Sequence, residues 1–105
     1  MAIARVSVLE FISPEALENA QRSHKEMRES VFPSLKMGLC IRTGPSSFID
    51  ISIYPSMEAA EENLEEREKF HEQVFGSSLK DEFFYQGNID YFFQTEGFGD
   101  LNLNE

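Results

Sequence analysis

The sequence has two amphipathic helical segments among four short segments of strand character, in the order strand, helix, strand, strand, helix, strand. A chain of 105 residues has room for one hydrophobic core. This order therefore predicts one α+β domain, in which four antiparallel strands form a sheet and both helices cover one of its faces. We expect residues 1–95 to form this domain and residues 96–105 to form a flexible polar tail. The expected strands span residues 4–12, 37–43, 48–54 and 89–95.

Both helical segments have clear start and stop signals. Ser13-Pro14-Glu15 places a capping serine, a first-turn proline and a first-turn acid in succession, and Pro33 ends this helix. Ser56 caps the second helix, and Gly76 stops it. Helices of this length in this order indicate the ferredoxin-like fold.

The segment 48–54 alternates most regularly, with Ile49, Ile51 and Ile53 on one face. We expect this isoleucine face to pack against the helices, and one register places Arg42 opposite Asp50. The segment 83–85 is either a short extra strand or part of a loop.

The opposite sheet face mixes aromatic and polar side chains. Such a face is too aromatic for solvent and suits the inside of a homodimer in which two sheets face each other. Its members are Leu9, Phe11, Phe48, Tyr54 and Phe92, together with Arg5, Ser7, Arg42, Asp50 and Asp90.

Charge and composition exclude several partners. The net charge of −10 would repel nucleic acid and anionic membranes. No apolar run approaches the roughly 18–20 residues that a membrane span needs. The single cysteine, Cys40, excludes an internal disulfide and favours a cytoplasmic location.

Three stretches carry a resemblance to a known family: Phe11–Glu15, Ile53–Ala60 and Gly87–Phe92. Over residues 4–95 the chain resembles the dimeric α+β barrel proteins, and within them the antibiotic-biosynthesis-monooxygenase-like domains. The resemblance implies that two sheets pair across a two-fold axis. The cofactor-independent members of this family oxygenate polyphenols. Members that cleave haem use a tryptophan, a histidine and a first-strand asparagine. Because this chain has no tryptophan and no asparagine on its first strand, we expect no haem cofactor.

Two histidines lie at the centres of the helical apolar stripes. His24 lies between Ala20 and Met27, and His71 follows Arg67 by one turn. An imidazole titrates near neutral pH, so each histidine is a candidate catalytic base in a cavity. Arg67 would bind an anionic or phenolic oxygen. The alternatives are core histidines satisfied by local acceptors, and an Arg67 that pairs with a nearby glutamate at the surface.

Two tyrosines, Tyr54 and Tyr91, are candidates for orienting an aromatic ligand, although such tyrosines are more often packing groups with a wet hydroxyl. We expect no metal site, because the two histidines come from different helices. Glu68 is the best additional ligand, and it offers no chelating spacing.

Two functional hypotheses follow from these residues. The first is a cofactor-independent monooxygenase that acts on a hydrophobic, aromatic or quinone-like small molecule in a pocket between sheet and helices. The second is a non-catalytic dimeric domain that binds a small ligand or responds to stress. Fold alone does not decide between them.

Overall fold

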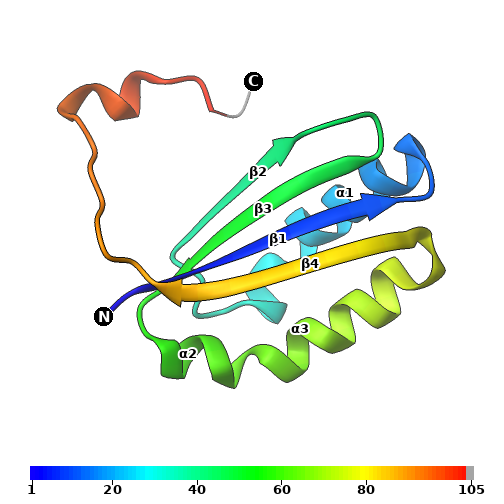
Figure 1. Ribbon diagram of the computed structural model, residues 1–105, viewed down its shortest axis with the longest axis horizontal. Coiled ribbons are helices and arrows are strands. Elements are labelled where there is room, and N and C mark those ends of the chain that lie inside the picture. Colours follow the sequence, from blue (N-terminus) through cyan, green and yellow to red (C-terminus); the bar gives the residue numbers. More distant parts are fainter. Residues whose placement is uncertain (104–105) are drawn as a thin grey trace.

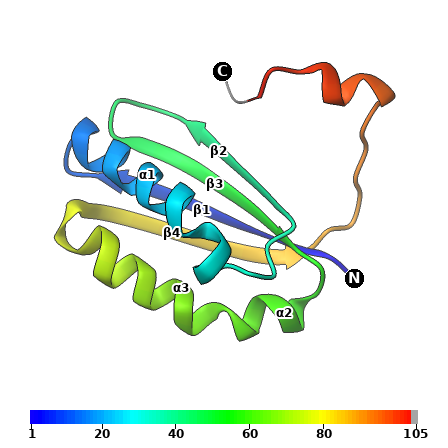
Figure 2. The same cartoon turned by 180° about the vertical axis from the view of Figure 1, so that it is seen from behind.

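The structure is a computed structural model that describes residues 1–103. Its four strands form one antiparallel sheet in the order β2-β3-β1-β4, and its helices cover one face of that sheet (Figures 1 and 2). The predicted ferredoxin-like α+β fold is therefore confirmed. The elements are β1 (Ile3–Phe11), α1 (Pro14–Val31), β2 (Met37–Arg42), β3 (Ser47–Tyr54), α2 (Met57–Glu62), α3 (Leu64–Phe70) and β4 (Leu79–Asn88).

The two predicted helix starts are confirmed by their caps. The Ser13 hydroxyl accepts a hydrogen bond from the backbone N–H of Ala16, and the Ser56 hydroxyl accepts one from Ala59, each at 3.1 Å. Each bond satisfies a donor that the first helical turn leaves free.

The second helical segment, which the sequence predicts as one helix, is divided. α2 and α3 meet at Asn63, which is 6% exposed and turns its side chain inward. After α3 the backbone widens into a π-helical turn, η1 (His71–Phe75), and Gly76 ends it with a φ of 50°. π-helical turns often mark functional sites, and this one begins at a candidate site residue.

The sheet faces are the reverse of the prediction. Leu9, Phe11 and Phe48 point toward the helices and form the core with residues such as Leu17 and Phe70. The prediction that the isoleucines pack against the helices was wrong, because Ile49, Ile51 and Ile53 alternate with the buried residues of β3 and lie on the open face. The open face consists of Ala4, Val6, Val8, Met37, Leu39, Ile41, Ile49, Ile51, Ile53, Phe83 and Tyr85.

The register between β2 and β3 also differs from the prediction. Cys40, not Arg42, lies opposite Asp50, and Arg42 lies opposite Phe48. Asp50 thus has Cys40 on one side and Ser7 of β1 on the other, in the middle of the helix-facing side.

The last strand is β4, and the predicted strand at 89–95 was wrong. β4 pairs with β1, where Phe83 lies opposite Val8 and Tyr85 opposite Val6. After β4 the chain leaves the sheet and projects from it, so Phe92 and Asp90 lie on neither sheet face (Figure 1). A short 3-10 helix, η3 (Glu96–Asp100), follows. Within residues 1–103, none of the helices has the length and apolarity to cross a membrane.

Candidate functional site

A cavity of about 390 Å³ lies between the sheet and the helices. It brings together four of the five candidate residues: His24 from α1, Tyr54 from β3, Arg67 from α3 and His71 from η1. The lining residues on α1 and β2, among them Lys25, Arg28 and Cys40, are exposed, so the mouth lies between these two elements. The cavity is also lined by Arg5, Ser7, Leu9, Phe32, Phe48, Asp50, Ser52 and Phe75.

A carboxylate lies against the imidazole ring of His71. Its Nδ1 lies 2.6 Å from Oε2 of Glu82 on β4, and its ring lies 4.7 Å from that of Phe75. The close approach of the His71 ring lowers the pKa of Glu82, although burial acts in the opposite direction, so this carboxylate stays charged. With Nδ1 directed at Glu82, Nε2 is the nitrogen that is free to accept a proton from a ligand.

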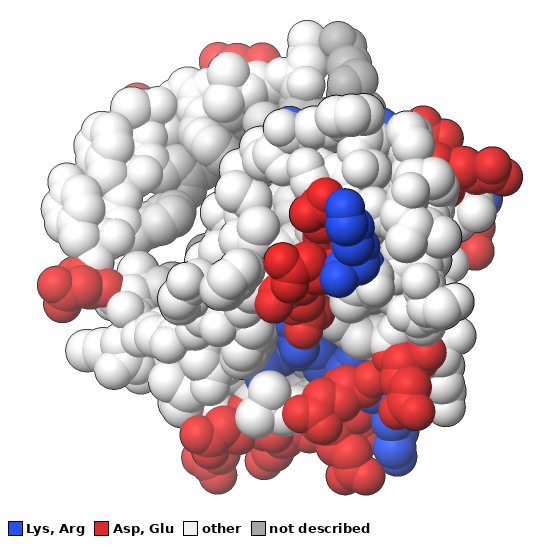
Figure 3. All heavy atoms as spheres, turned by 45° about the vertical axis from the view of Figure 1, so that its right-hand side comes forward, with Lys and Arg blue, Asp and Glu red and all other residues white. Residues whose placement is uncertain are grey.

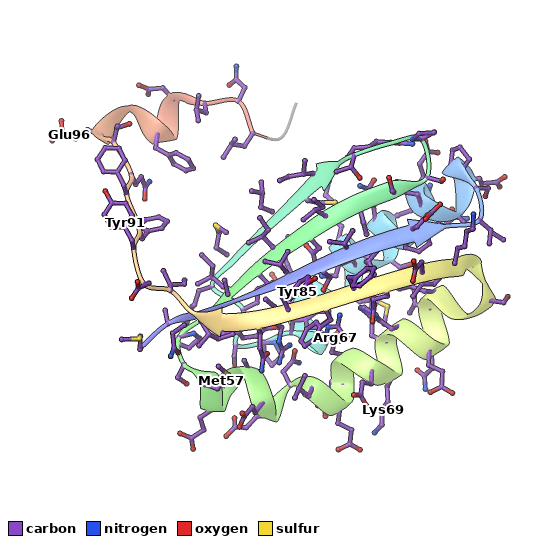
Figure 4. All side chains as sticks on the ribbon, in the orientation of Figure 1. Met57, Arg67, Lys69, Tyr85, Tyr91 and Glu96 are labelled. Carbon is purple, nitrogen blue, oxygen red and sulfur yellow. The ribbon has the colours of Figure 1, made fainter. Side chains whose placement is uncertain are left out.

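Arg67 lies beside this pair and is 8% exposed. It points from α3 toward the sheet, whereas Lys69 points away (Figure 4). Its guanidinium donates to the Ser7 hydroxyl at 3.0 Å, lies 3.6 Å from Glu82, and stacks 4.2 Å from the centre of the Phe84 ring. Burial lowers the pKa of Arg67 and Glu82 opposes that change, so the side chain is a fixed positive charge in the cavity.

A second arginine, Arg5, is 3% exposed and lines the same cavity. Its Nε donates to Gln86 at 3.1 Å, one amino group donates to Oδ1 of Asn63 at 3.1 Å, and the other donates to the Ala60 carbonyl. The Tyr54 hydroxyl also donates to Oδ1 of Asn63, at 2.9 Å. Asn63 therefore joins an arginine and a tyrosine of the cavity wall to the break between α2 and α3.

Asp50 and His24 lie on the sheet side and the helix side of the cavity. Burial raises the pKa of Asp50, although His24, His71 and Arg67 act in the opposite direction. Burial also lowers the pKa of His24, so its ring is neutral at neutral pH. The His24 ring packs 5.2 Å from the Phe32 ring and 5.9 Å from the Phe70 ring.

Tyr91 lies apart from this site. It is 84% exposed and belongs to the segment after β4, where no strand forms (Figure 4). It was placed at the site because the sequence predicts a last strand at 89–95.

Sequence reasoning missed four functional candidates: Arg5, Asp50, Asn63 and Glu82. The signal for Asn63 was its spacing, because it precedes Arg67 by four residues and His71 by eight on one helical face. The sequence prediction exchanged the two faces of the sheet. It therefore placed Arg5 and Asp50 on the dimer face and not in the cavity. Within residues 1–103, no three His, Cys, Asp or Glu side chains gather as a metal site would require.

No protein-family model matches the chain, and no curated protein matches it. Several solved structures are similar to the chain. SnoaB, a cofactor-independent oxygenase from Streptomyces nogalater, is similar over 87% of this chain and 95% of its own, with a TM-score of 0.68 and 11% identity. A dimeric ferredoxin-like protein from an uncultured marine organism matches 90% of this chain and 93% of its own, with a TM-score of 0.68 and 14% identity.

A third structure is a monooxygenase from the ActVA-Orf6 gene of Streptomyces coelicolor, solved with the ligand nanaomycin D. It matches 89% of this chain and 93% of its own, with a TM-score of 0.59 and 10% identity. The chain therefore shares the ferredoxin-like fold of these proteins, and antibiotic-biosynthesis monooxygenases are among its structural neighbours. The resemblance predicted from the sequence is confirmed at the level of the fold.

Proposed function

We propose that this protein is a cofactor-independent monooxygenase that acts on a hydroxyl-bearing aromatic or quinone-like small molecule. The observation that carries the proposal is His71, which faces a cavity of about 390 Å³ and is held at Nδ1 by Glu82, 2.6 Å away. A cavity of this volume matches the size of small-molecule sites. The cofactor-independent activity of SnoaB supports the reaction class.

The proposed reaction begins with a proton transfer. Nε2 of His71 accepts the proton of a ring hydroxyl, and Glu82 stabilises the imidazolium that forms. The positive charge of Arg67 stabilises the aromatic oxyanion. This electron-rich anion then reacts directly with dioxygen. One oxygen atom enters the ring as a quinone carbonyl, the other leaves as water, and the ring supplies the electrons.

We also propose that the protein acts as a homodimer through the open faces of two sheets. In this chain the open face is apolar, with Leu39, Ile41, Phe83 and Tyr85 between 40% and 62% exposed. Such a face is typical of an interface in a soluble protein. The marine protein with this fold is described as dimeric, which supports this arrangement.

Oxygen uptake with a dihydroxynaphthalene as probe tests the proposed function. We expect one molecule of oxygen consumed per hydroxyquinone formed by the wild-type protein, and a loss of about 100-fold or more in kcat for His71→Gln. Lys69→Gln, on the outer side of the neighbouring helix α3, should retain full activity. Saturable binding of the probe without any oxygen uptake would instead favour the non-catalytic ligand-binding domain.

A further inference from the structure

The charge of the cavity is opposite to the charge of the protein. Four of the nine basic residues of the chain line it: Arg5, Lys25, Arg28 and Arg67. Of the acidic residues that the structure describes, Asp50 alone lines it. The chain as a whole carries −10. Figure 3 shows the outer acidic character, with Asp and Glu side chains gathered around a few Lys and Arg side chains.

Arg5 carries a buried charge without a carboxylate partner among residues 1–103. Its hydrogen bonds go to the neutral oxygen atoms of Gln86, Asn63 and Ala60. Burial lowers its pKa, and the neighbouring charge of Arg67 acts in the same direction. A buried cation is costly unless an anion accompanies it. Arg5 therefore leaves a positive charge in the cavity wall that an anionic ligand would compensate.

Arg5 and Arg67 both line the cavity, and both contact the ring of Phe84. Their guanidinium carbons are 5.9 Å and 4.2 Å from the centre of the Phe84 ring. Glu82 is 3.6 Å from Arg67 and also binds His71, so it offsets only part of the positive charge. Two guanidinium groups that line one cavity are suited to bind a carboxylate.

The mouth of the cavity is positively charged, as its interior is. Lys25 and Arg28 are exposed on α1, where the lining residues reach solvent. Neither forms an ion pair within residues 1–103. In a strongly acidic protein, a basic entrance raises the local concentration of anionic ligands.

We infer that the ligand of this cavity is an aromatic acid, whose carboxylate binds between Arg5 and Arg67. The inference rests on the proposed function and names its substrate class: a hydroxy-aromatic acid, in which the carboxylate occupies the arginine pair and a ring hydroxyl faces His71.

The test compares two probes that differ in charge and hardly in shape, 2-naphthoate and 2-naphthamide. Binding is measured by calorimetry at low salt and at 0.5 M salt. We expect the wild-type protein to bind the acid at least about tenfold more tightly than the amide, and salt to weaken the binding of the acid alone. This comparison needs no variant, so it does not depend on how a mutated cavity folds.

Variants then locate the charge. Arg5→Met and Arg67→Met should reduce the preference for the acid to about twofold or less while the amide still binds. Lys69→Met removes an exposed charge of the same helix and should leave the preference unchanged. Equal binding of acid and amide by the wild-type protein would overturn the inference, as would a preference that survives both arginine variants or the binding of neither probe.

Oxygen uptake separates this inference from the proposed function. If the protein prefers the acid but takes up no oxygen with the hydroxylated probe, the monooxygenase proposal is wrong and the anion site is supported. If the protein takes up oxygen but binds the acid and the amide equally, the monooxygenase proposal is supported and the anion site is wrong.

Discussion

At the scale of one residue, the burial of Asp50 in the cavity wall affects the stability of the folded protein. Its carboxylate lies on a central strand, among His24, His71 and Arg67, and burial still raises its pKa. The folded protein thus binds the Asp50 proton more tightly than the unfolded chain does. The stability from this residue is present below its ordinary pKa of 3.8 and is lost as the pH rises through the raised value.

We therefore expect Asp50→Asn to stabilise the protein at pH 7 by roughly 0.5–2 kcal/mol, because it removes a buried charge without changing the size of the side chain. The gain should shrink as the pH falls toward 3.8. Urea melts at a series of pH values measure both effects. A gain that does not vary with pH, or a loss of stability at pH 7, would contradict this account.

His24 offers a second test at this scale. It lines a cavity, so His24→Ala should cost about 1 kcal/mol, mainly from its contacts with Phe32 and Phe70. Leu17→Ala, at a position that is 0% exposed, should cost about 2–5 kcal/mol. If urea melts give equal losses for the two variants, His24 is an ordinary core residue and the cavity interpretation fails for it.

At the scale of elements, Asn63 explains why the second helical segment is divided. The Asn63 amide donates to the Val31 carbonyl at 2.7 Å, and its oxygen accepts from Arg5 and Tyr54. One side chain therefore links α1, β1 and β3 at the point where α2 gives way to α3. The side chain turns inward, and Asn63 makes no side-chain cap to α3.

Asn63→Ala should destabilise the protein by about 2–4 kcal/mol, because it leaves buried polar groups of Arg5, Tyr54 and Val31 without a partner. Ser56→Ala removes a helix cap from α2 and should cost about 1 kcal/mol. Thermal melts of both variants give the comparison. A loss for Asn63→Ala no larger than that for Ser56→Ala would mean that water replaces this network.

The elements also show how far the sequence alone predicts this fold. The caps at Ser13 and Ser56 located both helix starts, because capping is local chemistry. The sheet faces were reversed because both are apolar in this chain, and a regular row of isoleucines resembles a core face. The face that packs against the helices carries polar residues such as Arg5 and Asp50 because it lines a cavity.

The last strand was misplaced for a similar reason. Its first half reads Leu-Lys-Asp-Glu, which is typical of a turn, while 89–95 is rich in aromatic residues. β4 is an edge strand that pairs with β1 alone, so charged residues are tolerated there. The candidate residues His24, Arg67 and His71 came together as the helical period predicts, whereas Glu82 depended on a strand that the sequence did not reveal.

At the scale of the whole molecule, the open sheet face is an apolar surface that a single chain leaves uncovered. Its rows of valine, isoleucine and aromatic side chains cross all four strands. Ile51 lies near the centre, with Val6 on one side and Leu39 on the other. A charge placed there cannot reach water in a closed interface between two sheets.

Ile51→Glu should therefore convert a dimer into a monomer of 12.1 kDa at micromolar concentration, as light scattering would show. Ile12→Glu is the matched control, because Ile12 is 64% exposed and lies outside the sheet. It should leave the dimer intact. A wild-type protein that is monomeric in the same experiment would remove the proposed dimer.

In the proposed function, a hydroxy-aromatic ligand binds in the cavity between sheet and helices, against both histidines. The chain has two histidines, and both line that cavity, so nitrogen NMR of the imidazole rings observes the site without interference. Under anaerobic titration with a dihydroxynaphthalene, we predict that the signals of His24 and His71 shift together and saturate with one dissociation constant. Binding of the probe with both imidazole signals unchanged would show that the ligand does not occupy this cavity.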